Sequence, residues 1–133
     1  MQQKGEIALT LLFEEKWDKT IAPSDRKMFQ SVYEQNPIQE GRLEFIPVRA
    51  AFNHQGCVLA SVCILNGKDD WRLQNRLLYY KEQEDLVAEG RFTHDLLVPS
   101  HTAVPWTFIF HPNSFIRPPS LQHWEISLQN DHK

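Results

Sequence analysis

Six histidines and two cysteines are the residues of this 133-residue chain best suited to catalysis or metal binding. The histidines are scattered, and no His-x-x-x-His or Cys-x-x-Cys spacing occurs that would hold a metal ion. His54, His94 and His101 fall in predicted turns and could gather at one end of a β domain, although solvated loop histidines are the simpler interpretation. The sequence therefore predicts no metal site and no cofactor.

The two thiols do not suggest a nucleophile. Cys57 and Cys63 fall in one apolar segment that is predicted to be a strand, where a rise of about 3.3 Å per residue separates them by roughly 20 Å. A reactive thiol would need to be exposed beside a base, so inert core cysteines are the better interpretation. The acidic run at residues 82–85 is interpreted as a solvated turn. We therefore predict that the chain is not an enzyme.

Charge and hydropathy exclude two classes of partner. The 14 basic and 17 acidic residues give a net charge of −3, which provides no general attraction to nucleic acid or to anionic lipid. No apolar run reaches the 18 or more residues of a membrane span. The expected location is the cytoplasm.

Period-two alternation in short blocks predicts an all-β fold, an immunoglobulin-like antiparallel β-sandwich of about seven or eight strands. A small barrel is the alternative. The first strand is expected at residues 7–13, the next at 43–52 with a bulge or an edge position at Pro47, and the most buried one at 57–67. The alternation is expected to resume afterwards through Trp71, Leu73, Leu77 and Tyr79. One short helix between the first two strands is expected to begin at Ser24 and end before Asn36. The whole chain, 1–133, is read as one domain with a core at about 6–112 and a C-terminal extension at 113–133.

The stretch PWTFIFHP is predicted to be a strand with one heavily aromatic face. Phe108 and Phe110 are expected in the core, whereas Trp106 at the strand's start is as consistent with a contact surface. Prolines at both ends are typical of an edge strand, which could still accept a strand from a partner. The residues predicted to contact a partner are Trp106, then Trp71 and Tyr80.

The order of several landmarks resembles the SLAP domain, the S-layer assembly protein family of the accessory Sec system in Gram-positive bacilli. The matching positions are Trp17, Phe29, Gly41 with LEFIPVRAAF, Gly56 with VLASVCILNG, LVAEGRF, Pro99 and PWTFIF. They span about residues 9–112, in a single copy. The resemblance implies a non-enzymatic β domain that assists protein secretion through contacts with export components or exported substrates.

Three functions remain open at this stage. The leading one is a protein-interaction module, an accessory factor in protein export or S-layer assembly that could form a homodimer by sheet extension. The alternative is a β-sandwich that binds a small ligand or carbohydrate. An enzyme would require His94 and His101 to meet carboxylates in a cleft.

Overall fold

The computed structural model describes residues 23–129, which are mostly β structure with one helix at the start. The strand predicted at residues 7–13 and Trp17 lie outside this range. The elements are α3 (Pro23–Gln35), β1 (Leu43–Phe52), β2 (Val58–Asn66), β3 (Trp71–Arg72), β4 (Arg76–Glu82), β5 (Asp85–Phe92), β6 (Leu97–Val98), β7 (Thr102–Phe110), the 3-10 turn η1 (Pro112–Ser114) and β8 (Trp124–Leu128).

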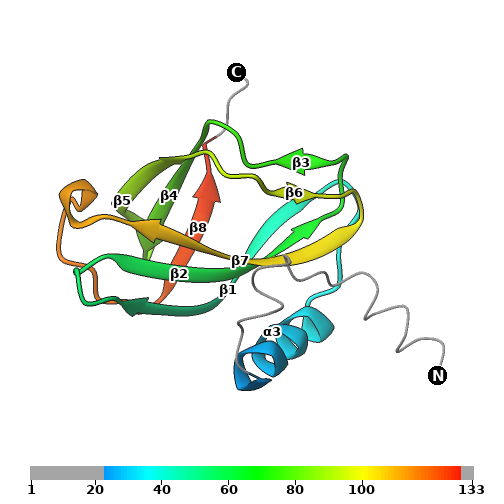
Figure 1. The fold of residues 1–133 in the computed structure, drawn as a ribbon, viewed down its shortest axis with the longest axis horizontal. Coiled ribbons are helices and arrows are strands. Elements are labelled where there is room, and N and C mark those ends of the chain that lie inside the picture. The colour runs from blue at the N-terminus through cyan, green and yellow to red at the C-terminus, as the bar shows by residue number, and fades with distance from the viewer. Residues whose placement is uncertain (1–22, 130–133) are drawn as a thin grey trace.

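The eight strands form three small antiparallel sheets (Figure 1). The first sheet has the order β1-β2-β7, the second has the order β5-β4-β8, and β3 pairs with β6 in the third. Immunoglobulin sheets contain at least four and three strands, and no such sandwich is identified among the described strands. The predicted all-β character is confirmed, while the immunoglobulin-like arrangement is not.

Strand β2 is the centre of the core, as its apolar sequence predicts. Val58, Ala60, Val62 and Ile64 have no exposed surface and pack in one cluster with residues of β4, β5 and β7. Phe108 and Phe110 of β7 are each only 1% exposed, so their predicted place in the core is confirmed. The register shift between Pro47 and Arg49 also confirms the irregularity expected in β1.

Helix α3 lies on the outer face of the first sheet, where Val32 and Tyr33 pack near Cys63, Leu65 and Ala103. The predicted start is displaced slightly, because Pro23 begins the helix, and Ser24 lies within it. Proline suits a first turn, where its missing N–H has no partner in the helix. The predicted end is confirmed.

Two expectations about the strand boundaries are wrong. The segment expected to extend outside the core from residue 113 onward contains β8, which pairs with β4 and buries Ile126. The alternation predicted through Leu77 and Tyr79 is also out of phase, since Leu78 and Tyr80 are the buried residues. The chain turns through Asn75, whose φ is 53°, and this turn resets the phase before β4.

Gly67, just after β2, is held against the start of β1. Its N–H donates to the Arg42 carbonyl at 2.7 Å, and its own carbonyl accepts from the Gly41 N–H at 2.8 Å. A Cβ atom at Gly67 would lie 1.9 Å from the carbonyl oxygen of Gln39. Only glycine therefore permits this close approach.

We predict that Gly67→Ala lowers the free energy of unfolding by about 3 kcal/mol, because the backbone must move apart. Gly41→Ala is the matched control. A Cβ atom there meets nothing within 4 Å, so only its φ of +80° costs energy, about 1 kcal/mol. Urea unfolding followed by tryptophan fluorescence would measure both, and equal losses would contradict the steric explanation.

Candidate functional site

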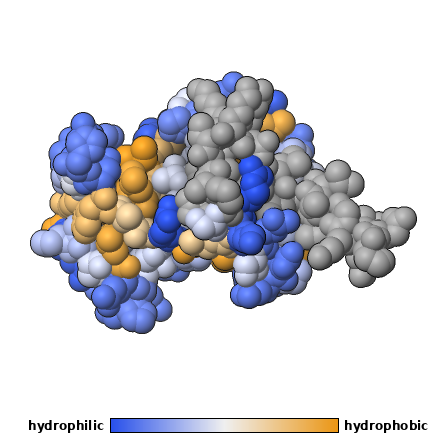
Figure 2. Space-filling view, turned by 60° about the horizontal axis from the view of Figure 1, so that its bottom comes forward, coloured by the Kyte–Doolittle hydropathy of each residue, from blue (hydrophilic) through white to orange (hydrophobic). Residues whose placement is uncertain are grey.

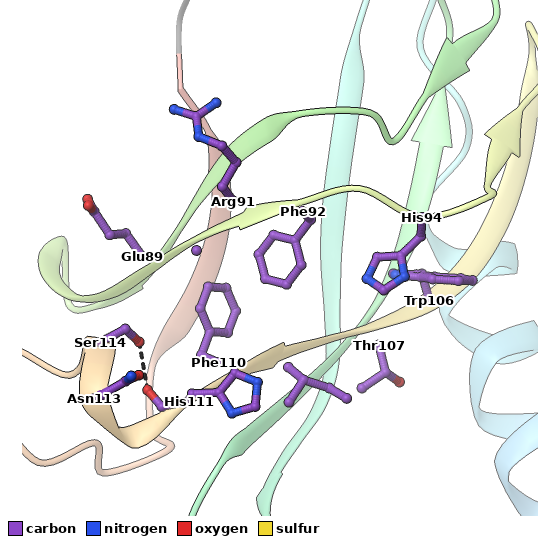
Figure 3. A pocket seen from close by; sticks show the side chains of 12 residues that line it. Glu89, Arg91, Phe92, His94, Trp106, Thr107, Phe110, His111, Asn113 and Ser114 are labelled. Atoms are coloured by element: carbon purple, nitrogen blue, oxygen red, sulfur yellow. Dashed lines mark hydrogen bonds between the residues drawn. The ribbon is translucent and has the colours of Figure 1, made fainter.

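A groove of about 520 Å³ lies between β5 and β7 (Figure 3). Residues 89–92 and His94 line one wall; residues 106, 107, 109–111, 113 and 114 line the other. Both walls are edges among the described strands, because β5 pairs only with β4, and β7 pairs only with β2. We call this feature the edge groove.

Two phenylalanines make the inner surface of the edge groove apolar. Phe92 and Phe110 point into it from opposite walls, with ring centroids 5.3 Å apart and an interplanar angle of 80° (Figure 3). A Cβ atom at Gly90 would lie 3.0 Å from the Phe92 ring, so the missing side chain makes room for that ring. The two rings contact edge to face, which fixes them in place.

Trp106 is the residue of the aromatic stretch that is not fully buried. It lies partly exposed at one end of the edge groove, and its ring centroid is 5.8 Å from that of His94. The opposite end of the groove is polar and is lined by Glu89 of β5 and by Asn113 and Ser114 of η1 (Figure 3). This position agrees with the predicted contact role of Trp106, which remains a prediction.

The other two predicted contact residues are in the core. Trp71 is 8% exposed and Tyr80 is not exposed at all. The Arg76 guanidinium covers the Trp71 ring at 5.3 Å, and Tyr80 stacks near Trp124 with centroids 6.0 Å apart. Because both rings are buried, neither offers a ring face to a partner. These two aromatic residues therefore contribute to core packing.

The three loop histidines do not gather at one end of the fold, in agreement with the simpler interpretation of them. His54 lies in the turn before β2 and His101 in the turn before β7, and the pairing of Val58 with Phe110 and of Asn66 with Thr102 places these turns at opposite ends of β2. Eight residue steps along a strand correspond to roughly 26 Å. Of these three histidines, only His94 lines the edge groove.

One serine, one histidine and one carboxylate do meet on the surface. The His101 ring contacts Ser100 Oγ through Nδ1 and Glu40 Oε1 through Nε2, each at 2.7 Å. The side chains of His101 and Glu40 are 56% and 83% exposed, and they line none of the grooves described here. In this solvated position the contacts fasten the turn at His101 to the turn before β1.

Both cysteines are free and buried, as predicted. Burial raises the pKa of Cys63 to about 12, so its thiol stays protonated at neutral pH. Cys57 Sγ lies 3.4 Å from His111 Nδ1 beneath the edge groove, but its side chain is only 2% exposed. Within residues 23–129, no group of three or more His, Cys, Asp or Glu residues is placed to hold a metal ion.

Glu82 is a buried carboxylate that the sequence did not reveal, because it opens the acidic run expected to be solvated. Its side chain accepts hydrogen bonds from the Tyr80 hydroxyl at 2.6 Å and from the backbone N–H groups of Ser120 and Leu121 at 2.9 and 2.8 Å. Arg117 lies 3.6 Å away. These bonds fasten the segment before β8 to the end of β4.

The Glu82 pKa is set by two opposing effects. Burial by itself raises it, but the hydrogen bonds from Tyr80, Leu121 and Ser120 outweigh burial and hold the pKa of Glu82 below its ordinary value. Burial, followed by the hydrogen bond to Glu82, raises the pKa of Tyr80, which therefore remains a donor. This cluster is structural, since it holds β8 in place.

A second groove, of about 660 Å³, lies between β1 and β8. Its walls carry charges of both signs, including Arg42, Glu44, Lys68 and Glu125. Arg42 and Glu44 form an ion pair at 3.4 Å. The contrast in polarity distinguishes it from the apolar interior of the edge groove.

We predict that Glu82→Gln lowers the free energy of unfolding by about 3 kcal/mol at pH 7, because an amide cannot accept all of these hydrogen bonds. A lowered native pKa means that the unfolded chain binds more protons, so the stability contributed by Glu82 is lost as pH falls below about 4.3. Thermal unfolding from pH 7 to pH 3 should show a flatter profile for the variant than for the wild type. Parallel profiles would contradict the assignment to Glu82.

No helix in the described range is long and apolar enough to cross a membrane. Among protein-family models, the one described as the SLAP domain matches residues 11–130. Neither the curated proteins nor the solved structures give a match.

Proposed function

This chain belongs to the SLAP domain family, and from that premise we propose that it is a non-catalytic protein-interaction module acting in protein export. The SLAP domain is linked to accessory secretion and is not a known catalytic family. The partner we propose is a secretion component or an exported substrate, S-layer proteins included. The proposed site of contact is the edge groove, with Trp106 as its anchor.

The observation that carries this proposal is the pair of open sheet edges on either side of one apolar groove. An edge strand offers unpaired main-chain donors and acceptors, and an extended segment can satisfy them by adding itself as a further strand. Trp106, which is partly exposed, then supplies apolar surface for the side chains of that segment. A half-buried tryptophan is typical of an interface anchor.

A small ligand or carbohydrate is less well supported. Sugar-binding sites present flat aromatic faces, whereas Phe92 and Phe110 are 8% and 1% exposed and meet each other edge to face. Main-chain groups along two strand edges suit a polypeptide better.

A cytoplasmic place of action fits a protein that meets its partner before export. The free thiols of Cys57 and Cys63 agree with a reducing compartment. A second copy of this chain could also pair at the edge of β7, and the experiment below separates that outcome from capture of another protein.

The proposal can be tested by photo-crosslinking in a Gram-positive host. A photoreactive phenylalanine analogue at Ile109, 44% exposed beside the edge groove, should capture an exported protein or a secretion component. The same analogue at Leu97, 37% exposed on β6, is the control and should not. Identical captured proteins at both positions, or only a second copy of the chain at Ile109, would contradict the proposed role.

Trp106→Ala in the Ile109 crosslinking background should reduce capture about tenfold or more, since a central tryptophan anchor is worth 2 kcal/mol or more. The thermal midpoint should stay within about 5 °C of the wild type, because the ring is only partly buried. A collapse of stability with unchanged capture would show that Trp106 belongs to the core alone.

A further inference from the structure

The direction of the main-chain groups in β7 follows from the hydrogen bonds at the two ends of β2. At its start, the Cys57 carbonyl accepts from the Asn53 N–H at 3.0 Å; just past its end, the Gly67 N–H donates to the Arg42 carbonyl at 2.7 Å. Both bonds point toward β1. Since main-chain groups alternate in direction along a strand, odd-numbered residues of β2 face β1, and even-numbered residues face β7.

Thr107 and Ile109 of β7 therefore direct their N–H and C=O groups away from β2. They lie opposite Ser61 and Leu59, which are odd-numbered, whereas Phe108 lies opposite Ala60. The Ser61 and Thr107 hydroxyls are 2.7 Å apart, as expected for the closer, non-hydrogen-bonded kind of pair.

Proline placement supports the same assignment. Pro105, like Thr107 and Ile109, lies opposite an odd-numbered residue of β2, so its main-chain nitrogen faces away from β2. A proline is tolerated in a sheet at such a position, because the N–H that it lacks would have faced outward. Outside the sheets, no described residue makes a backbone hydrogen bond with Thr107 or Ile109. Two donors and two acceptors thus line the edge groove ready for an added strand.

The inner face of this edge is apolar, and its outer face carries Ile109 between Thr107 and His111. Trp106 and Phe110 lie on the inner face, toward the core. On the outer face Ile109 is 44% exposed next to Leu59, with which it pairs. Apolar side chains gather on the part of this outer face that α3 leaves uncovered (Figure 2). An added strand would meet Trp106 with the side chains of one face and Ile109 with those of the other.

The charges of the edge groove favour an uncharged occupant. Glu89 and Arg91 on the β5 wall have opposite signs, and both side chains are exposed at the rim. Arg91 is already held by the Asn75 carbonyl and side chain, at 3.3 and 3.2 Å. Pro105 and Pro112 bracket the available edge, which leaves residues 106–111 for pairing.

We infer that the occupant is an unfolded polypeptide, which binds through a run of about five consecutive apolar residues added as a fourth strand to β7. This inference rests on the proposed function and names the class of partner. A run that is apolar on both faces is the sequence of a buried strand, which a folded protein hides and an unfolded chain exposes. Binding therefore selects export substrates before they fold.

The test uses fluorescence anisotropy of labelled nine-residue peptides with the wild-type chain. Each peptide has lysine-containing ends and five central residues. In the continuous peptide all five are Val or Ile. In the two alternating peptides Val and Ser alternate, one beginning with Val and the other with Ser. The continuous peptide should bind about tenfold or more tightly than either alternating peptide, because each of those loses one apolar face. Equal affinity for one alternating phase would overturn the inference that both faces are used.

N-methylation separates main-chain pairing from simple apolar contact. Methyl groups on every central amide of the continuous peptide should abolish binding, whereas methyl groups on alternate amides should be tolerated, because only every second amide faces β7. Binding that survives methylation of every central amide would overturn strand addition.

Thr107→Pro removes one outward N–H from β7, and Thr107→Val, which keeps it, controls for the lost hydroxyl. The proline variant should bind the continuous peptide about tenfold more weakly than the valine variant. Equal binding would overturn the assigned edge, and circular dichroism would confirm that both variants fold. If the proline variant does not fold, the N-methylated peptides still decide the question.

The unfolded-chain inference can be wrong while the proposed function is right. Capture at Ile109 of a folded secretion component, with no binding of any peptide, would overturn the unfolded-chain inference and leave an interaction module. Absence of specific capture at Ile109 would remove the proposed function itself.

Discussion

Burial of β2 on both faces is the constraint on which the rest of the structure depends. Residues 61–66 of this strand are buried without interruption, so neighbours must cover it from every side. Strands β1 and β7 pair with its two edges, α3 covers part of its outer face, and the second sheet covers its inner face. Among the described strands β7 pairs only with β2, so it is an edge strand of this sheet.

The second sheet is fixed in a different way, by a polar contact in the interior. Glu82 accepts hydrogen bonds from the segment that leads into β8. Because Glu82 and Leu121 are far apart in the sequence, this is a long-range contact. Buried carboxylates are costly unless their lone pairs are satisfied, and here the Tyr80 hydroxyl and two backbone amides satisfy them. Apolar packing thus places β7, whereas hydrogen bonding places β8.

Alternation in the sequence was sufficient to predict the strands that bury apolar side chains. It identified β2, the irregularity at Pro47 and the inward direction of Phe108 and Phe110, because burial on a pleated strand leaves a direct mark on residue order. It could not predict the burial of Glu82, because the backbone groups that donate to this carboxylate, at Ser120 and Leu121, are almost forty residues away. It also could not separate Trp106 from Trp71, because exposure of an aromatic ring depends on which strands lie opposite.

The two edges of the first sheet are treated differently, and this difference favours binding at β7. Pro47 lies opposite Val62, an even-numbered residue of β2, so its ring faces the outer edge of β1, and the register shift beside it distorts that edge further. An outward-facing proline and a bulge both hinder the addition of a further strand. Pro105 lies within β7 and Pro112 just after it, so the edge between these prolines remains regular. An exposed edge of this kind is an aggregation hazard unless it is used. The contrast between the two edges supports the proposed addition of a strand at β7.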